Sequence, residues 1–564
     1  MSPRPLVPGV LVLGLAPVLA VAAIACSSAA DTANSDSAVT TAKDPALSYV
    51  GQSVVDALGK QRALTALKGK TWEVTTGNVL SDGWLLPTIG SEWWGDNLAS
   101  LPTDTDCKAG DAGCDPDFLM RSCDGEGATC SSGTCTAFAP TVAADGQEPK
   151  KLCVGYADWF EEAFYQALVN AESFVDITSL WLPADRFLPA IKNGLARLAA
   201  RNTPVTVRIL SGNVSDFGPR AMLHTSDLVK KLSADLPKDS PIKLYVAEHS
   251  ASLQSWNHSK MIVSDGKSAL VGGHNMHTAD YQLKDPVSDL SMRLTGPAAA
   301  AAHRYANEVW DVACSRQYKT GIGLETFPAS LGCPKHLEPT GGTHGTGDTA
   351  IIAAGRTGAV KDNASDTALL AMVDAAKTSI VMSQEDILGG RIPKTNLSVA
   401  SPPNALLDRL AVAIGRGVDV YLVISNVDGG LFTTSYSHGW SAEETAAQMA
   451  DRMKAKTDAF PAGADVIGIL CDKLHVAPLR LANTERWADG KVFSNHAKFL
   501  MVDEQALYVG SQNLYTSDLA EFGYIVDSKD AAKVANDTFW APLWNFSKAA
   551  AASGSDAPSC SFRK

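Results

Sequence analysis

The pattern of apolar and polar positions predicts the same series of elements in two parts of the chain. An amphipathic helical stretch that leads into a short apolar strand occurs four times, in residues 159–181, 195–212, 368–387 and 407–426. Each part later shows two short apolar runs joined by a tight turn, then one more strand, and then a helix that begins near Pro297 or Lys529. Strands that alternate with helices predict an α/β architecture, and the recurrence predicts two similar halves.

The paired apolar runs carry the same polar residues at the same offsets. In both copies the Lys lies two, the Asp seven and the Asn seventeen residues after a His: His258, Lys260, Asp265 and Asn275, then His496, Lys498, Asp503 and Asn513. At about one chance in twenty for each of three positions, one His meets this pattern by accident roughly once in 10^4 trials. The chain has only 11 His, so core histidines in unrelated strands do not explain the repeat.

These residue types suit chemistry at a phosphoryl group. Imidazole can be nucleophile, acid or base near neutral pH, and two imidazoles on opposite sides of a phosphorus atom could divide these roles. Lys supplies positive charge, and Asn supplies a directed NH donor for the phosphoryl oxygens. We expect His and Lys, two residues apart, to lie on one face of a strand. The small pairs 272–273 and 510–511 should let the backbone approach the site closely.

On these residues the chain resembles the phospholipase D superfamily, whose signature is HxKx4Dx6Gx2N with Gly or Ser after the Gly. Further segments resemble the secreted bacterial phospholipases D of the streptomycete type over nearly all of residues 48–564, among them WEVTTGN, SWNHSK, DPVSDLSMRLTGPAAA, LANTERWADG, GSQNLY and AEFGYIVDS. The resemblance implies a duplicated α/β phospholipase D fold, in which two β-sheets are flanked by helices and the active site lies at the interface of the halves. It also implies hydrolysis of phosphatidylcholine to phosphatidic acid and choline, and transfer of the phosphatidyl group to other alcohols.

The resemblance implies a role for each motif residue. His258 is expected to attack phosphorus and form a phosphatidyl-histidine, while His496 protonates the leaving alcohol and later deprotonates water. Sequence alone does not distinguish the two histidines, and this order follows the family. The phosphoryl oxygens are expected to be held without a metal or other cofactor, by Lys260, Lys498, Asn275 and Asn513.

Four acidic residues near the motifs are expected to act indirectly. Asp289 and Glu521 follow the two His by 31 and 25 positions, where the family places carboxylates that hydrogen-bond the far nitrogen of each catalytic imidazole. Glu521 departs from the family, which usually has Asp there, and solvated loop acids are the alternative for both positions. The hairpins are expected to be braced by Asp265 and Asp503, with Gly273 and Ser511 as the small residues of the motif.

Aromatic residues near the motifs are candidates for a head-group pocket, because a quaternary ammonium is favoured over π faces. Tyr281, Tyr436 and Tyr515 are the candidates, and Trp256 could line the entrance; ordinary packing is the alternative for each. His277 stands where the family motif has Trp, which leaves the preference for choline open.

Composition and charge narrow the substrate classes. The chain has 564 residues, 45% of them apolar, which is enough for two large domains with proper cores. Its formal net charge of −13 argues against a nucleic-acid partner and makes a zwitterionic lipid, at a membrane or micelle surface, the easier substrate. We expect a monomer. A related phosphodiesterase that acts on sphingomyelin or nucleic acid, and a lipid-binding surface protein with a vestigial site, are the alternatives.

The amino terminus is typical of an export signal. Residues 1–25 contain a long apolar run that ends at Cys26, and a low-complexity linker over 26–47 follows. This order resembles a bacterial lipoprotein signal with Cys26 as the acylated residue, although Ala23 stands where Leu is usual; ordinary secretion and an uncleaved anchor are the alternatives. Beyond it we expect three segments: a first half over 48–330, a linker over 331–362 and a second half over 363–564.

The cysteine count fits an exported protein. Eleven Cys less Cys26 leave ten, an even number suited to disulfides. Six of them crowd into residues 107–153, a Gly- and Asp-rich insertion that should depend on its bridges, with a metal site as the alternative. The sequence leaves open how these six pair: Cys107, Cys114, Cys123, Cys130, Cys135 and Cys153. The resemblance implies two further pairs, Cys314 with Cys333 and Cys471 with Cys560.

Overall fold

The structure is a computed structural model, and both of its large sheets lie in one compact unit, Pro45–Lys564. It describes residues 46–563 except 103–106, 109, 117, 126–128, 132, 138–149, 213–223, 253–254, 283, 321–322, 340–344, 359–362, 390–401, 428–435, 437–438 and 558. The predicted signal segment and Cys26 therefore lie outside the described residues. Within the described ranges, no helix is both long and apolar enough to cross a membrane.

The first large sheet contains the first motif. Its strands, in spatial order, are β10 (Ser255–Trp256), β9 (Lys243–Ser252), β8 (Thr206–Gly212), β7 (Phe174–Ser179), β11 (Met261–Ser264), β12 (Ser268–Gly272), β13 (Leu290–Thr295) and β2 (Leu85–Pro87), with β14 (Leu324–Phe327) paired to β9. The strands β7, β8 and β9 are parallel because helices α4 (Phe187–Ala200) and α5 (Thr225–Leu232) connect them as crossovers. The strands β11 and β12 form an antiparallel hairpin, which is the predicted turn of the first motif.

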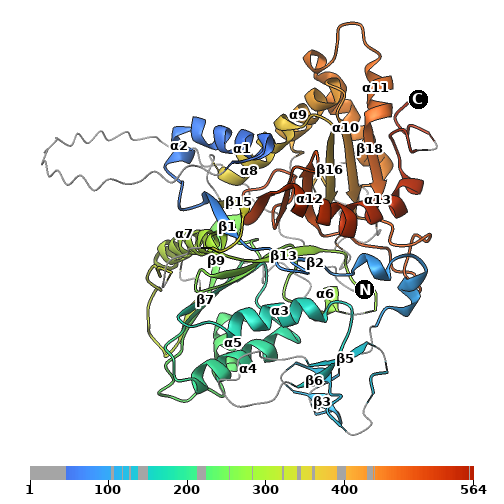
Figure 1. Cartoon of the computed structure of the whole chain (residues 1–564). Coiled ribbons are helices and arrows are strands. Elements are labelled where there is room, and N and C mark those ends of the chain that lie inside the picture. The colour runs from blue at the N-terminus through green and yellow to red at the C-terminus, as the bar shows by residue number, and fades with distance from the viewer. Residues whose placement is uncertain are drawn as a thin grey trace, which may run out of the picture. The chain divides into compact units, whose positions relative to one another are not determined.

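The second large sheet repeats this order. Its strands are β1 (Trp72–Asn78), β15 (Thr349–Thr357), β21 (Ala520–Asp527), β20 (Ala506–Gly510), β19 (Lys498–Val502), β16 (Ser379–Gln384), β17 (Asp419–Ile424) and β18 (Leu474–Pro478). Again the three strands at one end are parallel and the motif hairpin, β19 and β20, is antiparallel. The predicted duplicated α/β fold is therefore present, with two sheets flanked by helices (Figure 1).

The predicted boundaries between the halves differ from those in the structure. Strand β1 lies before the first motif in the sequence, yet it pairs with β15 in the second sheet, and helix α1 (Tyr49–Lys60) packs on α8 (Ala364–Ala375) of the second half. Strand β15 itself falls inside the predicted linker 331–362. Its apolar run AIIAA supplies the buried interior of a strand, so the linker is shorter than predicted.

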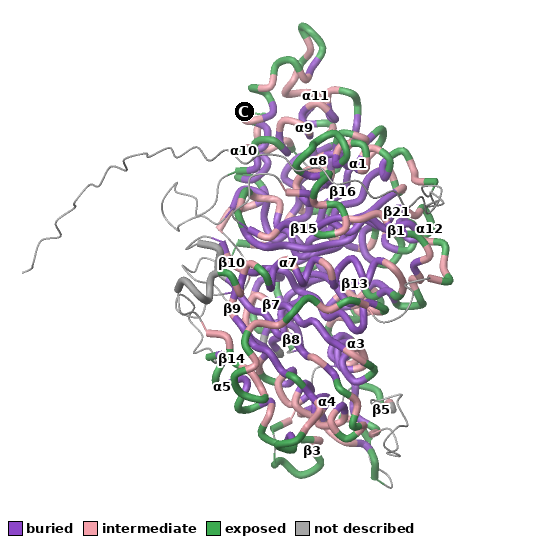
Figure 2. Tube along the Cα trace, turned by 90° about the vertical axis from the view of Figure 1, so that its left-hand side faces the viewer, coloured by how far each residue is buried: buried purple, intermediate pink, exposed green. Residues whose placement is uncertain are grey.

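Apolar side chains form cores on both faces of each sheet, and the strands of both sheets consist largely of buried residues (Figure 2). The largest cluster lies between the sheets and includes helix α7 (Pro297–Thr320), whose buried face begins with the alanines 298–302. These small side chains let α7 pack closely against strands of both sheets. The outer face of the first sheet is covered by α3 (Asp158–Val169), α4 and α5, and that of the second by α1, α8, α9 (Asn404–Gly415) and α10 (Ala442–Ala455).

Five disulfides join the ten described cysteines. Three lie in the insertion, Cys107–Cys114, Cys123–Cys135 and Cys130–Cys153, and two are the pairs that the resemblance implied, Cys314–Cys333 and Cys471–Cys560. Sulfur atoms of Cys123, Cys130 and Cys153 lie close together, but each is bridged, and the alternative metal site would need them as thiolates. The insertion also packs on the first half, where Arg186 Nε donates to the Phe118 carbonyl over 3.2 Å.

Candidate active site

The two motif histidines are held by backbone that lies just before a strand. His258 precedes β11 and His496 precedes β19, so the expectation that His and Lys share one face of a regular strand is wrong for both motifs. The cause is the preceding asparagine. Asn257 Nδ2 donates to the Ser179 carbonyl over 2.9 Å, and Asn495 Nδ2 donates to the Gln384 carbonyl over 3.0 Å. Each Asn side chain thus makes a hydrogen bond to the neighbouring strand that a backbone NH would make in a regular sheet.

Each histidine is tied to the other half of the molecule through its main chain. The His258 NH donates to the Ala520 carbonyl over 2.8 Å, and the His496 NH donates to the Ser288 carbonyl over 2.7 Å. Ala520 and Ser288 each come directly before one of the candidate carboxylates. The two halves therefore contact each other reciprocally, and the predicted meeting of both motifs at their interface is present in the structure.

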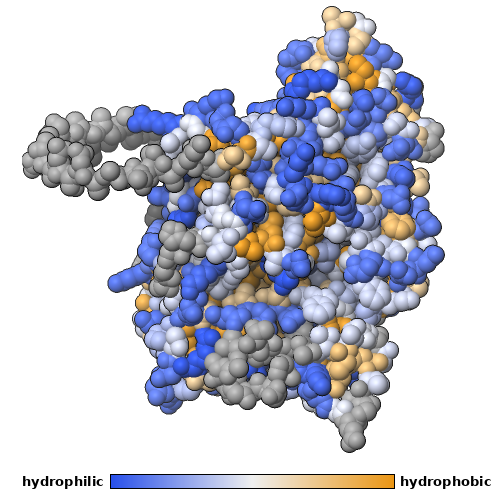
Figure 3. All heavy atoms as spheres, viewed as in Figure 1, coloured by the Kyte–Doolittle hydropathy of each residue, from blue (hydrophilic) through white to orange (hydrophobic). Residues whose placement is uncertain are grey.

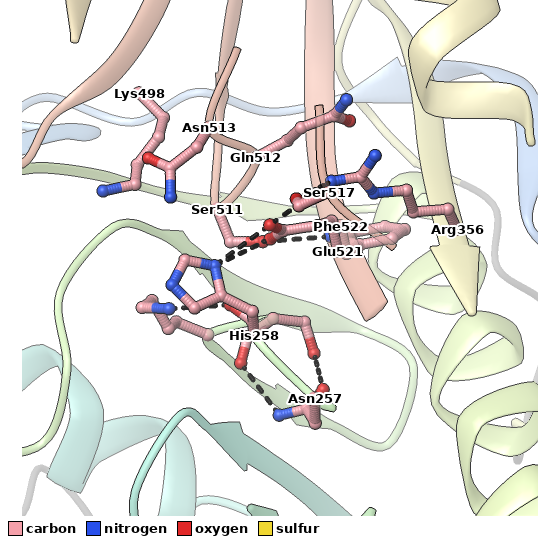
Figure 4. A network of polar contacts seen from close by, with 12 residues as sticks. Asn257, His258, Arg356, Lys498, Ser511, Gln512, Asn513, Ser517, Glu521 and Phe522 are labelled. Carbon is pink, nitrogen blue, oxygen red and sulfur yellow. Dashed lines mark hydrogen bonds and ion pairs between the residues drawn. The ribbon is translucent and has the colours of Figure 1, made fainter. Parts of the chain in front are cut away.

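The imidazole–carboxylate pairs cross between the halves. His258 Nδ1 lies 3.0 Å and 3.1 Å from the two Glu521 carboxylate oxygens (Figure 4), and His496 Nδ1 lies 2.6 Å from Asp289 Oδ2. The sequence separations count each acid from the His of its own half, whereas each acid contacts the His of the opposite half. All four side chains are buried, so the solvated-loop alternative does not describe these acids.

The small residues of the two motifs make room for these carboxylates. A Cβ atom added to Gly273 would lie 2.0 Å from Asp289 Oδ1, so only Gly allows this approach. In the second motif Ser511 Oγ donates to Glu521 Oε2, and Arg356 Nη2 lies 3.7 Å from Glu521 Oε1 (Figure 4). These two contacts seat the longer Glu side chain that replaces the usual Asp.

Two buried lysines lie beside the histidines. Lys260 Nζ donates to the His258 carbonyl over 2.7 Å, and Lys498 Nζ donates to the His496 carbonyl over 2.6 Å. Burial lowers the pKa of both side chains, that of Lys260 to about 7, while Glu521 opposes the shift of Lys260. A bound anion would stabilise both ammonium groups. This donor set suits a phosphoryl group rather than a metal cation.

Three of the five candidate head-group residues contact the motifs. The Asn275 Nδ2 amide lies 3.3 Å from Tyr436 Oη, and the Asn513 Nδ2 amide lies 2.8 Å from Tyr515 Oη. Tyr281 Oη donates to Asp289 Oδ2 over 3.1 Å and accepts from the Asn275 NH over 3.2 Å. The Tyr436 ring also lies 4.3 Å from the His496 ring between centroids.

The other two candidates lie in different surroundings. His277 is buried edge-on against Trp181, with ring centroids 5.4 Å apart. Trp256 lies in β10, where its ring faces Gly212. His277 is therefore packed within the first half, whereas Trp256 is partly exposed, and a role of either in a head-group pocket stays a prediction.

The two motif aspartates have the same structural role in both halves. Asp265 accepts from the NH groups of Glu172, Ser173 and Phe174 over 2.8–3.0 Å. Asp503 accepts from the NH groups of residues 377–379 over 2.7–2.8 Å, and also from the Tyr49 hydroxyl. Each aspartate thus fastens a hairpin turn to the start of the adjacent strand, β7 or β16, which is antiparallel to the first strand of the hairpin, and its contacts are those expected for a brace.

The structure adds residues that the motif analysis did not identify. Glu385, buried just after β16, has Oε2 3.8 Å from His496 Nε2, the nitrogen that Asp289 does not engage. Arg356, the charged residue of the apolar run TAIIAAGRT, is buried between Glu521 and Asp366. A signal existed for each, because a charged residue within or directly after a buried strand needs a partner.

Burial favours the neutral form of both imidazoles. Burial lowers the pKa of His258, although Glu521 opposes the shift. Burial, followed by the charge of Lys498, lowers the pKa of His496 well below its usual value, although Glu385 opposes the shift. A neutral imidazole can attack an electrophile. The second imidazole can act as an acid once an anion has restored its proton affinity.

Comparison with known proteins finds a sequence relative and several similar solved structures. No protein-family model matches the chain. The chain is 30% identical over 440 residues to a protein named phospholipase D from Streptomyces antibioticus, and the match covers 69% of this chain and 77% of that protein. A phosphatidylserine synthase structure from Haemophilus influenzae Rd KW20 matches with a TM-score of 0.47 and 13% identity, over 69% of this chain and 84% of that chain. A polyphosphate kinase structure from Porphyromonas gingivalis matches with a TM-score of 0.33 and 11% identity, over 67% of this chain and 47% of that chain.

Proposed function

The chain belongs to the phospholipase D superfamily, and on that premise we propose that it hydrolyses phosphatidylcholine-type phospholipids to phosphatidic acid and the free head-group alcohol. Membership of the superfamily supports phosphodiesterase activity for this chain. The phospholipid substrate, the histidine intermediate and the transfer of the phosphatidyl group to alcohols are parts of the proposal.

The first step forms a covalent intermediate. The neutral His258 Nε2 attacks phosphorus, the bond between phosphorus and the head-group oxygen breaks, and His496 gives its Nε2 proton to that oxygen. Glu521 keeps the His258 ring in one orientation and stabilises the positive charge that develops on it over 3.0 Å. The products of this step are the head-group alcohol and a phosphatidyl-histidine.

The second step returns the enzyme to its starting state. His496, now neutral, takes a proton from water, whose oxygen attacks phosphorus while the bond to His258 breaks. Phosphatidic acid leaves, and an acceptor alcohol in place of water would give a phosphatidyl alcohol instead. In both steps Lys260 and Lys498 balance the charge on the phosphoryl oxygens, and the amides of Asn275 and Asn513 donate to them.

One observation carries this proposal. Two buried histidines from opposite halves each have Nδ1 against a carboxylate, at 3.0 Å and 2.6 Å, with a buried lysine beside each ring. This arrangement fixes the tautomer of both rings and directs the two Nε2 atoms to chemistry, while the lysines select an anion. A lipid-binding protein with a vestigial site would not need four buried charges kept in this geometry, since burying each one costs free energy.

The experiment that tests the proposal compares substrates and intercepts the intermediate. We expect the protein to release head group from phosphatidylcholine faster than from sphingomyelin, and to leave DNA intact. Added ethanol should divert phosphatidic acid to phosphatidylethanol with little change in head-group release, because both products come from one intermediate. Chelator should leave the rate on a soluble short-chain phosphatidylcholine largely unchanged. Cleavage of DNA or sphingomyelin in preference to phosphatidylcholine would contradict the proposed substrate.

Two variants serve as controls for that experiment. His258→Asn and His496→Asn should each lower the rate by at least ~10^3, because the nucleophile and the acid act as a unit. If either variant kept more than about a tenth of the wild-type rate, the mechanism with two histidines would be wrong.

We also propose an exported protein that acts as a monomer at a lipid surface and not on nucleic acid. The five disulfides among the described residues support an oxidising compartment. The formal net charge of −13 supports a lipid rather than a polyanionic substrate. Acylation at Cys26, which lies outside the described residues, is tested by mass spectrometry of the amino-terminal peptide.

A further inference from the structure

A groove of about 850 Å³ lies on the protein surface apart from the histidines. One wall is α3, the floor includes β2 and the ends of β12 and β13, and the other wall includes Val534 of helix α12 (Lys529–Ala535). In the view of Figure 1, α12 lies above and α3 below β2 and β13. The space-filling view from the same side shows apolar atoms in the hollow between them (Figure 3).

The groove has an apolar rim that is exposed to solvent. Among the residues with a described accessibility, only four large hydrophobic side chains are exposed, and two of them, Trp159 at 49% and Val534 at 42%, line this groove from opposite halves. Trp84 and Phe160 continue the apolar lining inward as buried side chains. An exposed Trp at the mouth of an apolar groove is typical of a surface that meets a lipid interface.

The polar lining of the groove carries both signs of charge. Arg293 of β13 and Glu162 of α3 both line it, and their charges interact. Glu92 also lines the groove. An apolar groove with one cation and two carboxylates at its edge can hold a zwitterionic head group above an acyl chain, with the phosphate at Arg293 and the ammonium at a carboxylate or over the Trp159 ring.

The groove and the candidate active site are separate places on the same strand. Arg293 lies four residues from Asp289 along β13, which is roughly 13 Å at the rise of a strand. The two places are joined through side chains, because Phe160 stacks on His274 with ring centroids 4.4 Å apart, and His274 lies 4.8 Å from the Tyr281 ring. Phe160 therefore cannot serve as a test position, whereas Trp159 and Val534 lie at the exposed rim.

We propose that this groove binds a zwitterionic phospholipid of the bilayer, distinct from the molecule being hydrolysed, and so holds the enzyme at the lipid surface. The inference rests on the proposed function, because a phospholipase must stay at an interface to find successive substrates. A protein with a formal net charge of −13 gains little from electrostatic attraction to a membrane. Apolar insertion at Trp159 and Val534, with the head group at Arg293, supplies the missing affinity.

The test measures binding to phosphatidylcholine vesicles by sedimentation, with every variant made in the His258→Asn background so that lipid is not consumed. Val534→Ala should weaken binding about threefold and Trp159→Ala about tenfold, in proportion to the apolar area removed. Val427→Ala is the matched control, since Val427 is 37% exposed and does not line the groove. Arg293→Gln should weaken binding about threefold, and Arg293→Lys should restore most of it.

A second measurement separates docking from catalysis. With His258 intact, Trp159→Ala and Val534→Ala should lower the rate on vesicles and leave the rate on monomeric dibutyryl-phosphatidylcholine within twofold of wild type. If Val427→Ala weakened vesicle binding as much as Val534→Ala, or if the groove variants left binding unchanged, the groove would not be the docking site. Loss of a dimer on substitution of Trp159 would assign this face to self-association and overturn the proposal. A wild type that binds vesicles but cleaves no phospholipid would refute the proposed function and leave the docking result standing.

Discussion

The crossed carboxylates lead to a prediction in which two similar substitutions have different consequences. Asp289 serves His496, the proposed acid, over 2.6 Å, and Glu521 serves His258, the proposed nucleophile, over 3.0 Å. A substrate whose leaving group is p-nitrophenol departs without a proton, so it does not need the acid. In the first step, measured as the burst of released p-nitrophenolate before the intermediate is hydrolysed, the defect of Asp289→Asn should therefore largely disappear on a p-nitrophenyl phosphodiester, whereas the defect of Glu521→Gln should persist.

The magnitude follows from burial. Both His496 and Asp289 are at most 2% exposed, and removing one partner of a buried charged pair costs about 3–5 kcal/mol. If that cost falls on the protonated form of His496, the rate on phosphatidylcholine should fall ~10^2 to 10^4-fold, at about 1.4 kcal/mol for each factor of ten. On the p-nitrophenyl substrate the same variant should lose less than about tenfold.

The assay is the ratio of first-step rates on the two soluble substrates for each variant, taken from the pre-steady-state burst of released alcohol, because the second step needs His496 as a base on both substrates. Asp265→Asn is the matched control, because Asp265 accepts from residues 172–174, away from both histidines, and its substitution should leave the ratio unchanged. Circular dichroism and thermal unfolding check that each variant is folded. Equal losses of Asp289→Asn on both substrates would refute the reasoning. Rescue of Glu521→Gln instead would mean that His496 is the nucleophile and His258 the acid.

Three further predictions concern stability and proton uptake. Asp503→Asn should lower the free energy of unfolding by ~2–3 kcal/mol. Hydrogen bonds, acting against desolvation, hold the pKa of Asp503 below its usual value, so this loss of stability should be full at pH 7 and shrink as the pH falls below about 4. Chemical denaturation at several pH values measures it, and a loss that did not depend on pH would contradict the prediction. The mature protein should show no free thiol in denaturant without reductant, and removal of Cys471–Cys560, which spans 89 residues, should cost ~2–5 kcal/mol in the same assay. Binding of inorganic phosphate at pH 7 should be coupled to proton uptake by the protein, because the pKa of His496 is lowered in the free protein and a bound anion raises that pKa. Calorimetry in buffers of different ionisation enthalpy measures the number of protons taken up. His496→Asn should reduce this number, and release of protons by the wild type would refute the prediction.

Local and repeated signals were sufficient to predict the elements of each half. Apolar periodicity identified the helix and strand pairs 159–181 and 368–387, and the structure has α3 with β7 and α8 with β16 there. The repeat of eight polar residues identified both motifs. The bracing role of Asp265 and Asp503 could also be predicted, because a turn residue next to a strand has few partners other than nearby backbone NH groups.

Contacts between the halves could not be predicted in the same way. Glu521 lies 25 residues after His496 in the sequence but binds His258, because β21 begins at the interface opposite the first motif. Strand β1 has an ordinary strand pattern, and nothing in that pattern says that its partner is β15 of the other sheet. Sequence spacing indicates which side chains lie on the same helix or strand. The contact of Glu521 with His258 and the pairing of β1 with β15 depend instead on how the two folded halves pack against each other.

The symmetry of the two motifs raises the question of how two equivalent histidines acquire different roles. The strand registers make residues 178 and 383 equivalent, since each pairs with the residue three positions after its motif histidine. Two residues further on, the first half has Leu180 and the second has Glu385. His496 has a second carboxylate on its Nε2 side, that of Glu385, 3.8 Å away. That charge opposes the lowering of the His496 pKa by burial and by Lys498 and so favours a proton on Nε2, where a general acid needs it, whereas the equivalent position of the first half, Leu180, has no charge. The division of labour proposed for a symmetric pair can therefore come from one asymmetric residue next to the motif rather than from the motif itself.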